Sequence, residues 1–291
     1  MFPHDDAAEL WLAKARWPQG PECPYCRSRN VQVGAAHPTM PYRCRERQCR
    51  KRFSVRIGTP LQASKLGYRV WAIAIYLLTT GIKGTSSLKL HRDLGITQKS
   101  AWFLAHRIRE AWDIRPPHFR GPVEVDETYI GGKEHNKHAD KKLGSKAAAE
   151  AKTPVLGIRD RRSGKVRAEP VPDTKAITLQ ERVRKQAPDG VVVYSDSSTA
   201  YVGMINHESV NHSEGEYVRG NVHTNGVESF WAMLKRGITG TYHQLSPWHL
   251  FRYANEFAGR QNQRDLDTLD QMALMVQSLV GKRLTYQKLT L

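Results

Sequence analysis

The sequence has little of what a secreted, disulfide-bonded or membrane-spanning protein needs. Its four cysteines all lie before residue 50 in two close pairs, which is a poor disulfide framework for a chain of 291 residues. The longest apolar run, at residues 71–78, is far shorter than the roughly 20 residues that cross a bilayer. The N-terminus lacks the basic-then-apolar pattern of a signal peptide. We therefore expect a cytoplasmic protein in a reducing compartment, with no membrane partner.

Acidic residues are also scarce relative to basic ones. The sequence has 45 Lys and Arg against 28 Asp and Glu, and its net charge is +17. A surplus of this size favours a polyanionic partner such as nucleic acid, although a basic protein with solvated Lys and Arg faces has the same composition. The chain is 40% hydrophobic, which is typical of a globular protein, and it is long enough to bury a full core.

The sequence divides into five regions. Residues 1–18 predict a short helix, because apolar residues stand among helix formers before Pro18. Residues 19–58 hold the cysteines and a dense cluster of arginines. Apolar residues recur at helical spacing in residues 59–118, and strand and helix patterns alternate in residues 119–265. Residues 266–291 are expected to be a C-terminal tail.

The cysteines form two pairs with zinc-ligand spacing, namely Cys23 with Cys26 and Cys44 with Cys49. Four thiolates complete a tetrahedral zinc site, and this short polar segment has too little apolar content to fold without one. The Zn²⁺ is expected to be structural, because no ligand position is left open for catalysis. Without a metal ion, four cysteines would leave small thiols unpacked in a polar, basic segment. A redox C-x-x-C would need a strand–helix pattern that the surrounding sequence lacks.

Two short helices are predicted between Ser86 and Trp112, with a break at residues 94–97. Thr97 is placed to cap the second helix, which would project Lys99 and Arg107. Because Gly95 lies in the turn, the pair resembles a helix-turn-helix, and we take Lys99 and Arg107 as candidate DNA contacts. A plain structural bundle would have the same pattern.

The region from residue 119 predicts an α/β fold. Strand patterns at 122–130, 153–159 and 165–171 are followed by a helix at 174–187, a short apolar strand at 190–194 and a helix at 222–236. A turn is expected at 160–164 between the second and third strands. Residues 133–152 are rich in Lys, Ala and His and predict a basic loop or a short exposed helix.

Three acids stand where such a fold would gather a metal site. Asp126 is in the first strand, Asp196 follows the short buried strand, and Glu228 is on the helix predicted at 222–236. Phosphodiester cleavage is well served by two divalent ions about 3.5–4 Å apart, which hard carboxylate oxygens hold. Each acid alone is more often a turn cap or a solvated side chain. Lys235 and Arg236 would lie beside the acids and bind a DNA backbone by charge.

The acids lie in segments that closely resemble one group of bacterial insertion-sequence transposases. The resemblance covers residues 122–137, 194–196, 223–231 and 234–237, continues through 240–243 and 253–257, and includes residues flanking the cysteines. Proteins of this group have an N-terminal zinc ribbon and a DDE domain of ribonuclease H-like fold. The resemblance therefore implies an α/β protein in which a zinc ribbon and a helix-turn-helix-like segment precede a mixed-sheet catalytic domain. It also implies Mg²⁺ or Mn²⁺ held by Asp126, Asp196 and Glu228.

The function that the resemblance implies is cleavage at the ends of an insertion sequence and strand transfer into target DNA. The partners would be double-stranded DNA, as terminal inverted repeats and target, and further copies of the chain in a synaptic homo-oligomer, at the bacterial nucleoid. Asn225 is an alternative third ligand, although it offers only a neutral carbonyl oxygen. Two other functions stay open, namely a domesticated, non-catalytic zinc-ribbon regulator and a ribonuclease H-like nuclease that cuts without joining.

Overall fold

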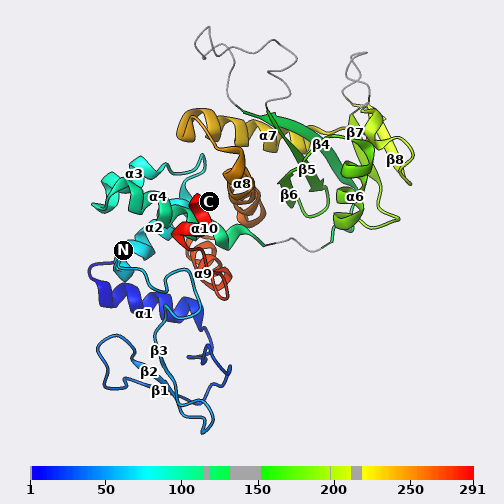
Figure 1. Ribbon diagram of the computed structural model, residues 1–291. Helices are drawn as coiled ribbons and strands as arrows, with labels where there is room; N and C mark the ends of the chain where they lie inside the picture. The colour runs from blue at the N-terminus through cyan, green and yellow to red at the C-terminus, as the bar shows by residue number, and fades with distance from the viewer. Residues whose placement is uncertain (1, 115–117, 132–151, 197, 211–217) are drawn as a thin grey trace. The chain divides into compact units, whose positions relative to one another are not determined.

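The computed structural model describes residues 2–114, 118–131, 152–196, 198–210 and 218–291 (Figure 1). Within it the chain divides into two units, one formed by Met1–Trp112 with Leu266–Leu291 and the other by Asp113–Asp265. The predicted basic stretch 133–152 lies outside the described residues, apart from Lys152. Among the described helices, none has both the length and the apolar composition that crossing a bilayer requires.

A small antiparallel sheet carries the cysteine region of the first unit. Its strands are β1 (Val31–Val33), β2 (Tyr42–Cys44) and β3 (Arg52–Phe53), in that spatial order. The rings of Tyr42 and Phe53 stack with centroids 5.6 Å apart, and Trp17 packs edge-on against both. This aromatic cluster is small, as expected for a segment that depends on a metal ion to fold.

Helices form the rest of the first unit. They are α1 (Asp5–Arg16), α2 (Tyr68–Thr80), α3 (Ser87–Leu94), α4 (Gln98–Arg109), the 3₁₀ turn η1 (Glu110–Trp112), α9 (Thr268–Ser278) and α10 (Tyr286–Thr290). Trp71, Ile75 and Leu78 are fully buried on α2, as their helical spacing predicted. The expected C-terminal tail instead contains α9, whose Met272 and Met275 are buried in the same core as α1 and α2.

The predicted break between α3 and α4 is present, with a cap on each side of it. The hydroxyl of Ser86 accepts a hydrogen bond from the Lys89 amide at 3.1 Å, and that of Thr97 accepts from the Ser100 amide at 3.2 Å. Gly95 ends α3 with a φ of 63°, a backbone conformation that favours glycine. The two-helix prediction and the capping role of Thr97 are therefore confirmed.

Five strands of the second unit form one mixed sheet in the order β6-β5-β4-β7-β8. The antiparallel part consists of β4 (Val123–Ile130), β5 (Thr153–Asp160) and β6 (Val166–Pro170). The strands β7 (Val193–Asp196) and β8 (His207–Val210) run parallel to β4. This arrangement confirms the predicted α/β mixed-sheet fold, which is consistent with a ribonuclease H-like domain.

Two strands of the sheet differ from the sequence prediction. The short strand was expected at residues 190–194, but β7 begins at Val193 and ends at Asp196, so Asp196 is its last residue. The edge strand β8 was not predicted, because only Val210 in it is strongly apolar. Its pairing with β7 therefore comes from tertiary structure and not from a local pattern.

Helices cover both faces of the sheet (Figure 1). They are α6 (Ala176–Gln186), α7 (Asn225–Gly237) and α8 (Leu250–Gln263), with the shorter segments η4 (Thr199–Tyr201), η6 (Ile238–Tyr242) and η7 (Pro247–His249). Val123 and Val125 of β4 pack in one core with Leu179 and Val183 of α6. Because side chains alternate along a strand, Glu124 and Asp126 face the opposite side, where Val227 and Trp231 of α7 pack in a second core.

Candidate active site and zinc centre

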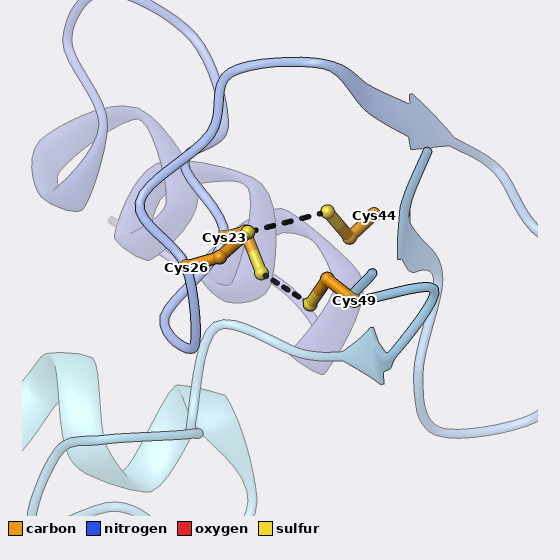
Figure 2. A group of neighbouring side chains, drawn as sticks. All are labelled: Cys23, Cys26, Cys44 and Cys49. Atoms are coloured by element: carbon orange, nitrogen blue, oxygen red, sulfur yellow. Dashed lines mark hydrogen bonds between the residues drawn. The ribbon is translucent and has the colours of Figure 1, made fainter. Parts of the chain in front are cut away.

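The four cysteines come together between two turns of the ribbon (Figure 2). The sulfur atoms of Cys23 and Cys49 lie 3.7 Å apart, and those of Cys26 and Cys44 lie 3.6 Å apart. All four sulfur atoms lie within 4.8 Å of one another. A tetrahedral zinc ion with Zn–S bonds of about 2.3 Å holds its sulfur ligands roughly 3.8 Å apart, so the cluster fits Zn²⁺.

The two cysteine turns share one backbone design, which explains their unequal spacing. In the first, the Arg27 amide donates to the Cys23 carbonyl at 2.8 Å, and in the second the Arg50 amide donates to the Glu46 carbonyl at 3.0 Å. Both arginines have positive φ values, 61° and 47°. Glu46 thus takes the place of the first cysteine in the second turn, and Cys44 supplies its thiol from two residues earlier, at the end of β2.

The thiol pKa values differ within the cluster. Burial raises the pKa of Cys44 to about 12, and neighbouring thiols add to the effect. The pKa of Cys49 is lowered, chiefly by the backbone N–H of Lys51. Four thiolates in one cluster repel one another, and a divalent cation both offsets that repulsion and favours the deprotonated thiols that bind it. The arrangement therefore supports a structural Zn²⁺ with all four positions filled by sulfur.

The first two candidate acids lie on neighbouring parallel strands. The ladder between β4 and β7 pairs Val123 with Val193 and Glu124 with Tyr194. Asp126 and Asp196 each stand three residues beyond the first pair, at equivalent positions. The third acid, Glu228, is in the first turn of α7, the helix packed on the face toward which Asp126 points. The sheet and this helix therefore bring together the three acids that the sequence singled out.

The electrostatics of Asp126 reflect this proximity. Its pKa is raised from 3.8 to about 6, first by burial, then by the charge of Asp196 and further by that of Glu228. The backbone N–H of Glu127 and the indole of Trp231 act in the opposite direction. Within the described part of the chain, only the cysteines bring three or more candidate ligand atoms within 4.8 Å of one another, so the acids form a more open set.

Each of the three acids accepts a hydrogen bond that holds its side chain. Asp126 Oδ1 accepts from the Glu127 amide at 2.8 Å, and Asp196 Oδ1 accepts from the Ser198 amide at 3.1 Å. Glu228 Oε1 accepts from the hydroxyl of Thr224 at 2.7 Å. The alternative ligand Asn225 is the first residue of α7 and is exposed.

Two further acids of β4 belong to this region, and the sequence did not select them. Glu127 has a pKa raised to about 8, by burial and then by Asp126 and Asp196. Glu124 is 1% exposed and accepts a hydrogen bond from the Val227 amide of α7 at 2.8 Å. The alternation along β4 could have indicated both residues. It places Glu127 on the same face as Val125 and Glu124 on the same face as Asp126, and burying a charged side chain on either face costs free energy.

The candidate DNA contacts differ in their surroundings. Lys235 and Arg236 are exposed in the last turn of α7, and Lys99 is exposed in the first turn of α4. Arg107 is buried, and its guanidinium donates to the Gln62 carbonyl at 3.0 Å and lies over the Phe103 ring. Helical periodicity identified the helix but did not indicate which face packs inward. The burial of Arg107 argues against a DNA contact by this residue.

Two family models match the chain. Residues 118–262 match the ISXO2-like transposase domain, and residues 3–52 match the transposase zinc-ribbon domain. The chain belongs to this family of insertion-sequence transposases. One relative, from Halobacterium salinarum (strain ATCC 700922 / JCM 11081 / NRC-1), is described as "Uncharacterized protein in transposable element ISH50". It is 28% identical over 295 residues, which cover 94% of this chain and 98% of the relative.

The matched segments coincide with the two sites of this transposase. The zinc-ribbon match contains all four cysteines of the cluster, and the domain match contains Asp126, Asp196 and Glu228. The resemblance inferred from the sequence and the predicted zinc ribbon are therefore confirmed.

Proposed function

We propose that this transposase is a DDE enzyme that cleaves DNA at the ends of its insertion sequence and transfers the freed 3′ end into target DNA. Asp126, Asp196 and Glu228 hold the divalent metal ions of the reaction. The observation that supports the proposal is geometric: Asp126 and Asp196 stand at equivalent positions on neighbouring parallel strands, and α7, which carries Glu228 in its first turn, packs on the face toward which Asp126 points. The raised pKa of Asp126 agrees with this proximity.

The chemistry of the donor set fits Mg²⁺ or Mn²⁺. Acids that raise one another's pKa gain from a shared cation, which offsets their repulsion, and both ions prefer carboxylate oxygens. When bound, a metal pair supplies activation of the attacking oxygen and stabilisation of the leaving one.

The choice of Glu228 over Asn225 as third ligand rests on charge and orientation. The charge of Glu228 contributes to the raised pKa of Asp126, and the Thr224 hydroxyl fixes its carboxylate. Asn225 offers a neutral oxygen, which contributes less to holding a divalent cation.

DNA is bound through positive charge outside the acid cluster. Lys235 and Arg236 lie two turns beyond Glu228 on α7, where a phosphate backbone that enters the site passes them. Lys99 lies in the first turn of α4, the second helix of the helix-turn-helix-like pair, and binds the terminal repeats together with the zinc ribbon. Synapsis of two element ends requires at least two copies of the chain, which act on DNA in the bacterial cytoplasm.

The decisive experiment is incubation of the protein with a duplex that carries the terminal inverted repeat, in the presence of Mg²⁺ or Mn²⁺. We expect metal-dependent cleavage followed by joining to a target duplex, both abolished in Asp126→Asn. Asp189→Asn, which changes an exposed aspartate in a turn, is the matched control and should leave both steps unchanged. Cleavage without joining would identify a nuclease, and DNA binding without cleavage would identify a regulator.

A further inference from the structure

The helix that carries Glu228 begins in an unusual way. Thr224 is the residue before α7, where a threonine hydroxyl ordinarily accepts a hydrogen bond from a backbone amide of the first turn. Here its side chain makes no such bond and instead donates to Glu228 Oε1 at 2.7 Å. Thr224 is 1% exposed, so its hydroxyl is shielded from solvent.

A residue distant in sequence caps the helix in place of Thr224. Glu124 Oε2 accepts a hydrogen bond from the amide of Val227, in the first turn of α7, at 2.8 Å. Amides at a helix start have no partner within the helix, and the positive end of the helix dipole favours a carboxylate there. Glu124 lies two residues before Asp126 on β4, so it joins the helix that carries Glu228 to the strand that carries Asp126.

Two arginines at the C-terminal end of β5 also bind Glu124. Glu124 Oε1 accepts from Arg161 Nε at 2.9 Å and from Arg159 Nη1 at 3.4 Å. Arg161 also donates to the carbonyls of Asn221 and His223, in the segment that leads into α7. A Cβ atom at Gly226 would lie 2.2 Å from Arg159 Nη1 and 2.5 Å from Glu124 Oε2, so the helix start approaches this group as closely as a glycine permits.

We propose that Thr224 is a positioning residue for the third metal ligand, and that Glu124 frees it for this role by capping α7 in its place. The inference rests on the proposed function, because it assigns Glu228 to the metal site. The Thr224 hydroxyl favours one orientation of the otherwise exposed Glu228 carboxylate before the metal ion binds. Metal ligands generally depend on such hydrogen-bonded neighbours, whose loss weakens metal binding about 10–100-fold.

The test compares Thr224→Val, which removes the hydroxyl at nearly constant volume, with Thr224→Ser, which keeps it. Mn²⁺ binding to the DNA-free protein is followed by electron paramagnetic resonance, and the Mn²⁺ concentration for half-maximal cleavage is measured separately. We expect both readouts to weaken about 10-fold in Thr224→Val and to recover in Thr224→Ser. Ser229→Ala, which removes an exposed hydroxyl from the same helix, is the matched control. If Thr224→Val does not fold, Thr224→Ala replaces it, because it places no methyl group against the carboxylate.

Asp126→Asn distinguishes a failure of the positioning role of Thr224 from a failure of the metal-site assignment. If it abolishes Mn²⁺ binding while Thr224→Val binds Mn²⁺ as the unaltered protein does, the positioning role is overturned and the metal site stands. If neither change affects Mn²⁺ binding, the assignment of the metal site and the positioning role fail together. A lower melting temperature of Thr224→Val with unchanged Mn²⁺ affinity would show a purely structural role and would also overturn the inference.

Discussion

Asp126 and Asp196 occupy equivalent positions on the neighbouring parallel strands β4 and β7, three residues beyond the Val123–Val193 pair. Burial, and then the repulsion between these two carboxylates at one level of adjacent strands, raise the pKa of Asp126 to about 6. Folding the metal-free protein therefore costs free energy at this position. The raised pKa of Asp126 therefore makes both the stability of the protein and its affinity for metal ions depend on pH.

The first prediction is that Asp126→Asn stabilises the metal-free protein at pH 8. The folded pKa of Asp126 is raised from 3.8 to about 6, so the folded state binds more protons than the unfolded state between these values. The free energy of unfolding must then fall as the pH rises from about 4 to about 6, and the loss persists above that. We expect a gain of roughly 1–3 kcal/mol at pH 8 and little gain near pH 4, measured by urea unfolding with a chelator present.

The matched control for that measurement is Asp189→Asn, because Asp189 is exposed in a turn. It should change the free energy of unfolding by less than about 0.5 kcal/mol at either pH. Equal stability of Asp126→Asn and the unaltered protein across the whole pH range would contradict the electrostatic account of the site.

The second prediction concerns cleavage at limiting metal concentration. Metal binding requires Asp126 to be ionised, so protons compete with the metal ion and the rate should fall as the pH drops below about 6. Single-turnover cleavage at a fixed, subsaturating Mn²⁺ concentration gives the midpoint of this decline. Raising the Mn²⁺ concentration should move the midpoint to lower pH. A midpoint that does not depend on metal concentration would instead indicate acid unfolding.

The sequence predicted those parts of the fold that are governed by local patterns. The helical spacing on α2, the alternation in β4, and the cap of Thr97 each depend on residues close together in the chain, and each is confirmed. The cysteine spacing likewise predicted the cluster of four thiols. The strand β8 was missed, because its residues have no pattern of their own and pair with β7 only in the folded sheet.

The acids of the candidate site could be predicted from the sequence, but the contacts that hold them in place could not. Order and context selected Asp126, Asp196 and Glu228, yet nothing near Glu124 in the sequence indicates that it caps a helix that begins at Asn225. Arg107 shows the same limit, because a helix pattern does not reveal which charged side chain packs against Phe103. Contacts between distant segments decided both cases.

The third prediction is that Zn²⁺ is required for the ribbon to fold. The purified protein should contain one zinc ion per chain, and Cys44→Ser should lose it, because the remaining three thiols leave the tetrahedral site incomplete. Loss of zinc should also disperse the aromatic cluster around Trp17, which is measurable as a change in tryptophan fluorescence. Ser28→Ala, which removes a hydroxyl bound to Glu46, is the control and should retain the metal. Full zinc content in Cys44→Ser would contradict the four-cysteine site.

The fourth prediction is that Glu124→Gln lowers the free energy of unfolding by about 3 kcal/mol, because it leaves the partly buried Arg159 and Arg161 without a charged partner. Urea unfolding provides the measurement. Glu181→Gln, which breaks an exposed ion pair with Lys185 on α6, should cost far less, because solvent screens that pair. Equal losses in the two variants would mean that the Glu124 group contributes no more than a surface ion pair.

The fifth prediction concerns the salt dependence of DNA binding. Lys235 and Arg236 are exposed in the last turn of α7, and each phosphate contact that they make releases a bound counterion from DNA. Lys235→Ala with Arg236→Ala should therefore reduce the slope of log K against log salt concentration by about 2, measured with a terminal-repeat duplex by fluorescence anisotropy. Lys185→Ala, on the helix that covers the opposite face of the sheet, should leave the slope unchanged. If Lys185→Ala reduced the slope as much as each of the other two substitutions, the effect would come from net charge and not from DNA contacts along α7.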